Sequence, residues 1–188
     1  MANVLKNLGT AHAWLVHGND GLDEITTTTS TQVVELKNGT LRKFEISPEQ
    51  YGLPRALPAD IKGGDPAANA QAMRSLFEGA TGPYRDIVVL NAAAALVIAD
   101  KAADIPGGIA LAAEALDFGR ARHVLDELVK TKWAKEKVGR FCRYKADSVC
   151  NPANGPGPLG NSLSSVTGRR TAGLLGVVKP NDTRSECN

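Results

Sequence analysis

The sequence predicts an α/β fold in which strands and a hairpin come first and three helices follow. Three observations carry this prediction: a continuous apolar run at "AWLVHG", an Asn-Gly pair between two further apolar runs, and apolar residues at helical spacing after them. The chain has 188 residues, of which 43% are hydrophobic and 22% are charged. This composition is ordinary for a folded domain of moderate size.

The first elements are the end of a helix and a buried strand. Val4 to Leu8 are expected to end a helix, with Gly9 as its C-terminal stop. The apolar residues of segment 13–18 follow one another without alternation, which is typical of a strand in a parallel sheet covered on both faces. We therefore expect this strand to lie inside the domain.

A hairpin is expected next, in the segment "TQVVELKNGTLRKFEI" (31–46). Its two apolar runs flank Asn38-Gly39, and this dipeptide is a strong signal of a two-residue turn between antiparallel strands. The apolar faces of the hairpin are expected to consist of Val34, Leu36, Leu41, Phe44 and Ile46.

Three helices are expected after a turn-rich surface segment. Asp65-Pro66 is a cap followed by a proline at the first helical position, and this helix presents Met73, Leu76 and Phe77 on one face before Gly79 ends it. The second helix runs from Pro83 or Tyr84 to about Lys101 and is apolar nearly all round, so we expect it in the domain centre. The third begins after Pro106-Gly107-Gly108 and continues at helical spacing to Leu128.

Charge and composition divide the chain near Val129. Residues 1–129 carry 11 Lys+Arg and 16 Asp+Glu, a net charge of −5, whereas residues 130–188 carry 11 and 4, a net charge of +7. Low hydrophobicity with excess charge is typical of segments that do not fold. We expect a globular unit at 1–129 and a basic, Gly/Pro/Ser-rich, disordered tail at 130–188. Cys142 and Cys150 in this tail have no second pair and no nearby histidine, so they indicate neither a metal site nor a disulfide.

The bulk properties exclude several classes of partner. A net charge of +2 favours neither nucleic acid nor a membrane surface. The longest apolar stretch, 87–99, is interrupted by Asn91 and is too short to span a bilayer. We expect a cytoplasmic protein in which Asn91, if buried, makes a structural hydrogen bond to a neighbouring loop.

Asp23 and Glu24 follow the first buried strand and form the candidate metal site. Gly18 and Gly21 indicate that the chain turns there, so that the two carboxylates face a common crevice at the end of the strand. Two hard oxygen ligands suit Mg²⁺, which takes its other ligands from water and phosphate groups. The alternative is that both acids are solvated loop residues, which is the more frequent situation for an isolated Asp-Glu pair.

Three other features are weaker candidates. His17 has the residue type for phosphate binding or proton transfer, but it is better explained as the residue that closes a strand. Asp20 is expected to lie in the turn. The run Lys62 to Asp65 has the glycines of a phosphate loop, yet a turn followed by a normal helix start explains it better.

Several segments resemble the anthranilate phosphoribosyltransferase family, in the order in which the family has them. They contain "VHGNDGLDEI", "YGLPRALPADIKGGD" and "GPYRDIVVLNAAAALVIAD", and the resemblance covers about Val4 to Val129. The first of these distinguishes the family from the pyrimidine nucleoside phosphorylases, which share its fold. The resemblance implies that the chain is part of the nucleoside phosphorylase/phosphoribosyltransferase catalytic domain.

The resemblance also implies an activity: transfer of the phosphoribosyl group of phosphoribosyl pyrophosphate (PRPP) to anthranilate, with release of pyrophosphate, in tryptophan biosynthesis. It implies a homodimer, Asp23 and Glu24 as the ligands of Mg²⁺, and no catalytic nucleophile. The family's Gly-Thr-Gly-Gly-Asp loop, Asn-x-Ser-Thr segment and Lys-His-Gly-Asn stretch do not occur in this sequence. We therefore expect a fragment of the transferase, and the alternative is an inactive remnant or a complementing half with no catalysis alone.

Overall fold

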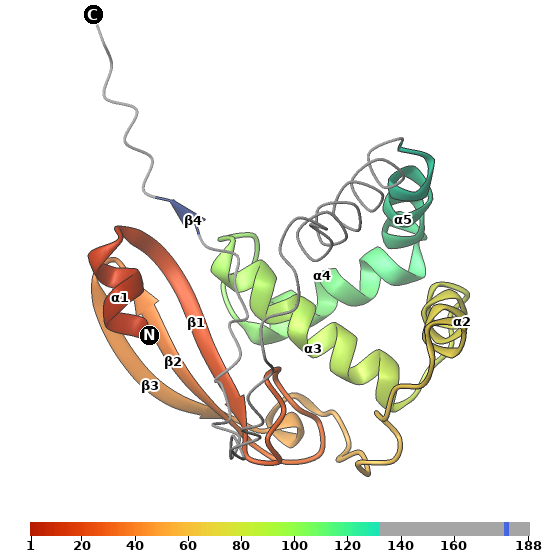
Figure 1. Ribbon diagram of the computed structural model, residues 1–188, viewed down its shortest axis with the longest axis horizontal. Coiled ribbons are helices and arrows are strands. Elements are labelled where there is room, and N and C mark those ends of the chain that lie inside the picture. Colours follow the sequence, from red (N-terminus) through yellow and green to blue (C-terminus); the bar gives the residue numbers. More distant parts are fainter. Residues whose placement is uncertain (132–178, 181–188) are drawn as a thin grey trace, which may run out of the picture. The chain divides into compact units, whose positions relative to one another are not determined.

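The structure is a computed structural model that describes residues 1–131 and 179–180 (Figure 1). The chain divides into two units, one made of Met1–Gly119 with Arg170–Asn188 and the other of Arg120–Arg169. Within the second unit, the described element is helix α5 (Arg120–Lys130). The expected tail lies almost wholly outside the described residues, as do Cys142 and Cys150, so the boundary near Val129 stays a prediction.

The first unit contains one sheet with the strand order β3-β2-β1-β4. Its strands are β1 (Thr10–Gly18), β2 (Thr31–Lys37), β3 (Thr40–Ile46) and β4 (Lys179–Pro180). β1 pairs with β2 from His12 to Gly18, whereas β4 is paired only with Thr10 and His12. The sheet with its helices confirms the predicted α/β class.

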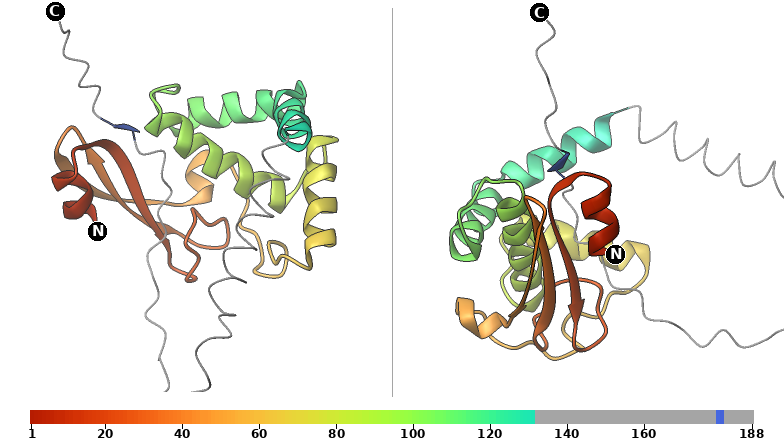
Figure 2. Two further views of the ribbon diagram at one scale, coloured as in Figure 1. Left: turned by 45° about the horizontal axis from the view of Figure 1, so that its top comes forward. Right: turned by 90° about the vertical axis from the view of Figure 1, so that its left-hand side faces the viewer.

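The parallel pairing expected for segment 13–18 is wrong for the described strands, because each of their pairings is antiparallel. The expected burial of β1 on both faces is confirmed, and it accounts for the apolar run. Trp14 and Val16 point toward helix α3 (Pro83–Ile98) and belong to the main core, while Ala13 and Leu15 on the opposite face are also buried. Figure 2 shows the short helix α1 (Ala2–Asn7) on the face of the sheet opposite α3, and α1 contacts both β1 and β2.

The predicted hairpin is confirmed. β2 and β3 pair in register up to Lys37 and Thr40, so that Asn38 and Gly39 alone form the turn. Both turn residues have positive φ, 49° and 77°, which the tight turn of a twisted hairpin requires and which Asn and Gly tolerate. Of the apolar residues expected on the hairpin faces, Leu36 and Ile46 are fully buried and Leu41 is 38% exposed.

The helix that begins at Asp65-Pro66 is confirmed as α2 (Pro66–Phe77). The Asp65 carboxylate accepts a hydrogen bond from the main-chain N–H of Ala68 at 2.8 Å. Its predicted apolar face is only partly buried, since Leu76 is 3% exposed and Met73 is 40% exposed.

Four α-helices follow the hairpin among the described residues, where three were predicted. The last predicted helix is two helices, α4 (Ile105–Asp117) and α5, because Gly119 adopts a left-handed φ of 71° and ends α4. α4 also begins earlier than expected, since the Asp104 carboxylate accepts the N–H of Gly107 at 2.8 Å and caps its first turn. α3 ends at Ile98 rather than near Lys101, and Asp100 has a φ of 54°.

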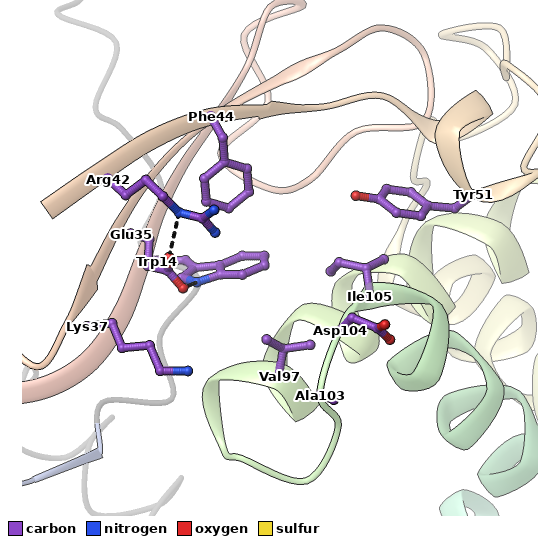
Figure 3. Close-up of a pocket in the computed structure, with 10 residues that line it drawn as sticks. All are labelled: Trp14, Glu35, Lys37, Arg42, Phe44, Tyr51, Val97, Ala103, Asp104 and Ile105. Atoms are coloured by element: carbon purple, nitrogen blue, oxygen red, sulfur yellow. Dashed lines mark hydrogen bonds and ion pairs between the residues drawn. The ribbon is translucent and has the colours of Figure 1, made fainter. Parts of the chain in front are cut away.

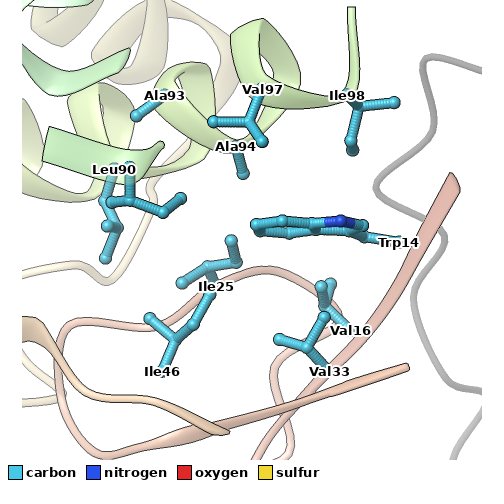
Figure 4. Packing of buried hydrophobic residues seen from close by; sticks show 11 residues of the cluster. Trp14, Val16, Ile25, Val33, Ile46, Leu90, Ala93, Ala94, Val97 and Ile98 are labelled. Carbon is cyan, nitrogen blue, oxygen red and sulfur yellow. The ribbon is translucent and has the colours of Figure 1, made fainter. Parts of the chain in front are cut away.

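The core lies between α3 and the sheet (Figure 4). α3 is the central helix, as predicted, and its Leu90, Ala94 and Ile98 are fully buried. The whole cluster consists of Trp14, Val16, Ile25, Val33, Ile46, Leu90, Ala93, Ala94, Val97, Ile98 and Ile105. Ile25 comes from the loop that carries the candidate acids, so the core holds that loop in place.

Gly108 allows α4 to approach α3, and its replacement is expected to destabilise the fold. A Cβ atom at this position would lie 2.7 Å from the main-chain oxygen of Ala93 and 2.8 Å from its Cα. Backbone atoms cannot move aside cheaply, so Gly108→Ala should lower the free energy of unfolding by about 1–3 kcal/mol in urea titrations. Ala110→Ser on the exposed face of the same helix should change it by less than about 0.5 kcal/mol. Equal effects of the two substitutions would contradict close helix packing at Gly108.

Candidate functional site

The loop that joins β1 to β2 carries the candidate metal ligands. β1 ends at Gly18, whose N–H donates to the carbonyl of Leu22 at 2.9 Å, and Asn19 N–H donates to the carbonyl of Ser30 at 2.9 Å. These bonds close the loop on itself at its base. The prediction that the chain turns at Gly18, rather than continuing as a strand through the acids, is confirmed.

Asp20 holds the interior of this loop together. Its carboxylate accepts the hydroxyl of Thr26 at 2.6 Å, the hydroxyl of Thr28, and the main-chain N–H of Leu22 at 3.1 Å. Partial burial raises the pKa of Asp20, but these hydrogen bonds stabilise the charged form and together hold the pKa below its usual value. Asp20 therefore organises the loop as an anion, a role larger than the simple turn position that the sequence predicted.

Asn91 fixes the loop to the central helix. Its amide oxygen accepts the N–H of Ile25 at 3.0 Å, and its amide nitrogen donates to the carbonyl of Ile25 at 2.8 Å and to that of Ile87 at 2.9 Å. The predicted structural bond from Asn91 to a neighbouring loop is confirmed. Because Ile25 directly follows Glu24, α3 positions the main chain next to the acidic pair.

Asp23 and Glu24 lie exposed on this loop. Among the residues that the structure describes, neither carboxylate has a hydrogen bond or an ion-pair partner, and no group of three or more His, Cys, Asp or Glu side chains is placed to hold a metal ion. Two exposed hard oxygen donors, free of a competing cation, fit the chemistry of Mg²⁺, which keeps several waters and phosphate oxygens as ligands. The metal role of the pair stays a prediction.

The structure gives His17 and the run Lys62 to Asp65 ordinary structural roles. His17 pairs with Gln32 near the end of β1, as expected for a residue that closes a strand. The glycines before Asp65 form an ordinary helix start, in which the N–H of Gly64 donates to the amide oxygen of Asn69 at 2.8 Å. This favours the interpretation of Lys62 to Asp65 as a turn before a helix over its interpretation as a phosphate-binding loop.

Sequence reasoning missed a polar cluster on the sheet. The buried carboxylate of Glu35 accepts Trp14 Nε1–H at 2.9 Å and Arg42 Nε–H at 3.1 Å, and it lies 3.1 Å from Nε2 of His12. Burial raises the pKa of Glu35, but its partners, Trp14 first, outweigh this and lower it. One signal for this cluster was available in the sequence: His12 and Trp14 are two residues apart on one strand, so their side chains lie on the same face.

The pH dependence of stability is expected to reveal the role of Asp20. Because its folded-state pKa lies below the unfolded value of about 3.9, its stabilising effect is present above that pH and is lost as the pH falls through the folded-state pKa. Asp20→Asn should therefore lower the melting temperature at pH 7, and the difference from the parent should shrink below about pH 4. The matched control is Asp126→Asn, an exposed carboxylate on α5. A difference that is constant with pH would contradict this role.

The family model described as "Glycosyl transferase family, a/b domain" matches residues 1–122. The anthranilate phosphoribosyltransferase of Parvibaculum lavamentivorans is 53% identical over 137 residues, which are 73% of this chain and 40% of that protein. The corresponding protein of Azospirillum brasilense is 58% identical over 129 residues, 69% of this chain and 36% of its own length. The chain thus spans about two fifths of the relatives it matches.

Solved structures give the same result for the fold. The anthranilate phosphoribosyltransferase of Thermus thermophilus has a TM-score of 0.60 at 38% identity, over 67% of this chain and 37% of that one. The Saccharomyces cerevisiae structure in complex with PRPP and Mg has a TM-score of 0.55 at 24% identity, over 60% of this chain and 33% of that one. No helix in residues 1–131 is long and apolar enough to cross a membrane.

Proposed function

Because this chain belongs to the glycosyl transferase family with the a/b domain, we propose that it provides the magnesium-binding part of an anthranilate phosphoribosyltransferase. The substrates proposed are PRPP and anthranilate, since the relatives that match at more than half identity are named for that reaction. The observation that carries the proposal is the exposed Asp23-Glu24 pair on a loop fixed from both sides, by Asp20 within it and by Asn91 from the core.

The loop would act by positioning two charges. In phosphoribosyl transfer the bond from ribose C1 to the pyrophosphate oxygen breaks, positive charge develops on the ribose, and negative charge develops on the leaving group. A magnesium ion held by Asp23 and Glu24 would stabilise the leaving pyrophosphate without a proton transfer. Asp20 and Asn91 would keep the two carboxylates in place before the substrate arrives, so that little reorganisation is needed in the reaction.

A chimeric enzyme tests this proposal. Residues 1–122 would replace the matching segment of the Azospirillum brasilense relative, which is 58% identical over the compared residues. We expect PRPP-dependent and Mg²⁺-dependent consumption of anthranilate, followed by the loss of its fluorescence. A chimera that is folded and dimeric but leaves anthranilate unchanged would contradict the proposal. The homodimer itself is proposed for the whole enzyme.

A second candidate is a half that has no catalysis alone and complements another polypeptide. This candidate is favoured because the sequence contains no Gly-Thr-Gly-Gly-Asp loop for the diphosphate of PRPP. The chain by itself should then give no turnover, and turnover should appear after mixing with the separately expressed N-terminal part of the relative. Turnover by the chain alone would exclude this candidate.

A further inference from the structure

We propose that the outer edge of β1, along residues 13–18, binds residues 173–178 of the same chain as an antiparallel strand that continues β4. In the sheet order β3-β2-β1-β4, β2 pairs with one edge of β1 from His12 to Gly18, whereas β4 pairs with the other edge only at Thr10 and His12. Among the residues that the structure describes, no strand lies beside residues 13–18 at this outer edge. Unpaired main-chain groups at a sheet edge are where a further extended segment adds.

Two hydrogen bonds at the ends of β1 show which main-chain groups point to the outer edge. On the β2 side, Asn38 N–H donates to the carbonyl of Ala11 at 2.8 Å. Gly18 N–H instead donates into the loop that follows β1, at 2.9 Å, and not to β2. Since the direction of main-chain groups alternates along a strand, the odd-numbered residues of β1 bond to β2. The N–H and C=O groups of Trp14 and Val16 therefore point to the outer edge.

The burial of β1 indicates that these outward groups have partners. Val16 has 0% exposure as a whole residue and Trp14 has 3%, so water does not reach their main-chain groups freely. Buried N–H and C=O groups are almost always hydrogen-bonded. The indole N–H of Trp14 is already bonded to Glu35 at 2.9 Å, and Figure 3 shows its ring between Phe44 and Val97. What this edge still requires is a main-chain partner.

The position and direction of β4 identify this partner. β4 runs antiparallel to β1, with Lys179 opposite His12, so the residues before Lys179 would lie opposite the residues after His12. The six residues 173–178 then match the six residues 13–18 in length, because paired strands advance by equal steps. The same unit of the chain contains the sheet and Arg170–Asn188.

The sequence of residues 173–178, "GLLGVV", suits a place beside a buried strand, because it contains no charged or polar side chain. In the continued register Val177 would lie opposite Trp14 and Leu175 opposite Val16. Both aliphatic side chains would then join the core face of the sheet, and each pair would exchange its outward main-chain hydrogen bonds. This segment is the exception that we propose to the disorder expected for residues 130–188.

An engineered disulfide tests the proposal on the full chain. Ala13→Cys and Val178→Cys would face each other as a pair without mutual hydrogen bonds, and such pairs have Cα atoms about 4.5 Å apart, within disulfide range. We expect this bond to form within one chain on mild oxidation of a dilute sample, measured by mass spectrometry of a digest. Ala13→Cys with Val177→Cys is the matched control and should stay reduced, because position 177 faces the other side of the sheet. The background carries serine at the three natural cysteines, Cys142, Cys150 and Cys187.

Hydrogen exchange of the β1 amides gives a second readout. The N–H groups of Trp14 and Val16 should be protected in the full chain, and Leu175→Pro should accelerate their exchange by about 10-fold or more, because proline disrupts strand pairing. The N–H of Leu15 points to β2 and should stay protected, which separates local release of the edge from global unfolding. Leu163→Pro, which lies outside the segment, should leave all three amides unchanged.

The outcomes that contradict the proposal are distinct. Exchange of the Trp14 and Val16 amides as fast as that of exposed amides would overturn it, as would equal oxidation of the two cysteine pairs or no effect of Leu175→Pro. A disulfide that joins two chains, or protection that increases with protein concentration, would assign the edge to a second copy of the chain and would overturn it as well.

Discussion

Asp23→Asn or Glu24→Gln in the chimeric transferase is expected to reduce turnover by a factor of about 10² or more. Each change removes one charged oxygen ligand from the proposed magnesium site but keeps the size of the side chain. The loss corresponds to the electrostatic stabilisation of a leaving group in a preorganised site. The measurement is kcat at saturating PRPP over a series of Mg²⁺ concentrations, and the variants should also need more Mg²⁺ for half-maximal rate.

The control for this prediction is Glu78→Gln. Glu78 is an exposed acid at the end of α2, outside the loop between β1 and β2, so its replacement should leave kcat unchanged. Binding of Mn²⁺ to the isolated chain, followed by electron paramagnetic resonance, gives a readout that needs no catalysis. Near-normal rates together with unchanged Mn²⁺ binding would mean that Asp23 and Glu24 are solvated loop residues only.

Asn91→Ala is expected to lower the free energy of unfolding by roughly 2–4 kcal/mol, the largest stability effect predicted for this chain. The substitution removes the partners of both main-chain polar groups of Ile25, a residue with 0% exposure. Each buried group left without a partner costs about 1–3 kcal/mol. The measurement is a urea titration, with Mn²⁺ affinity measured in parallel because the same bonds position the acidic pair.

Asn69→Ala is the matched control for Asn91→Ala. Asn69 makes the same pair of bonds, accepting the N–H of Gly64 at 2.8 Å and donating to its carbonyl at 3.0 Å, but at an exposed site. Water can replace the lost amide there, so the cost should stay below about 1 kcal/mol. Similar losses for the two variants would show that burial of Ile25 does not determine the effect.

The sequence predicted most of the described fold because the decisive signals were local. Asn38-Gly39 allows the backbone of a tight hairpin, and Asp65-Pro66 combines a cap with a fixed φ, so these elements were found with their boundaries. The pairing direction of β1 was predicted wrongly, because burial of both faces produces the same apolar run in parallel and antiparallel sheets. The break at Gly119 was missed, because apolar residues repeat at helical spacing on both sides of it.

The candidate site was predicted in part. Asp23 and Glu24 were proposed from the sequence because two acids directly after the end of a strand are a recognisable pattern, and their metal role stays a prediction. The role of Asp20 in organising the loop was underestimated. This role depends on the hydroxyls of Thr26 and Thr28, which reach its carboxylate only after the loop has folded back. The cluster around Glu35 was missed for a similar reason, since Trp14 and Arg42 come from strands on either side of β2 and meet only across the sheet.

The connectivity of the first unit has a consequence for how fast the chain folds. Its most extensive contacts join β1 with β2, β2 with β3, and α3 with α4, all of which are consecutive or nearly so along the chain. Short loops close at low entropic cost, so we expect the three strands β1 to β3 and the helix pair α3–α4 to nucleate independently. Their docking through Asn91 and Ile25, 66 residues apart, would then be the late step. Gly39→Ala should slow folding, whereas Asn91→Ala should mainly accelerate unfolding.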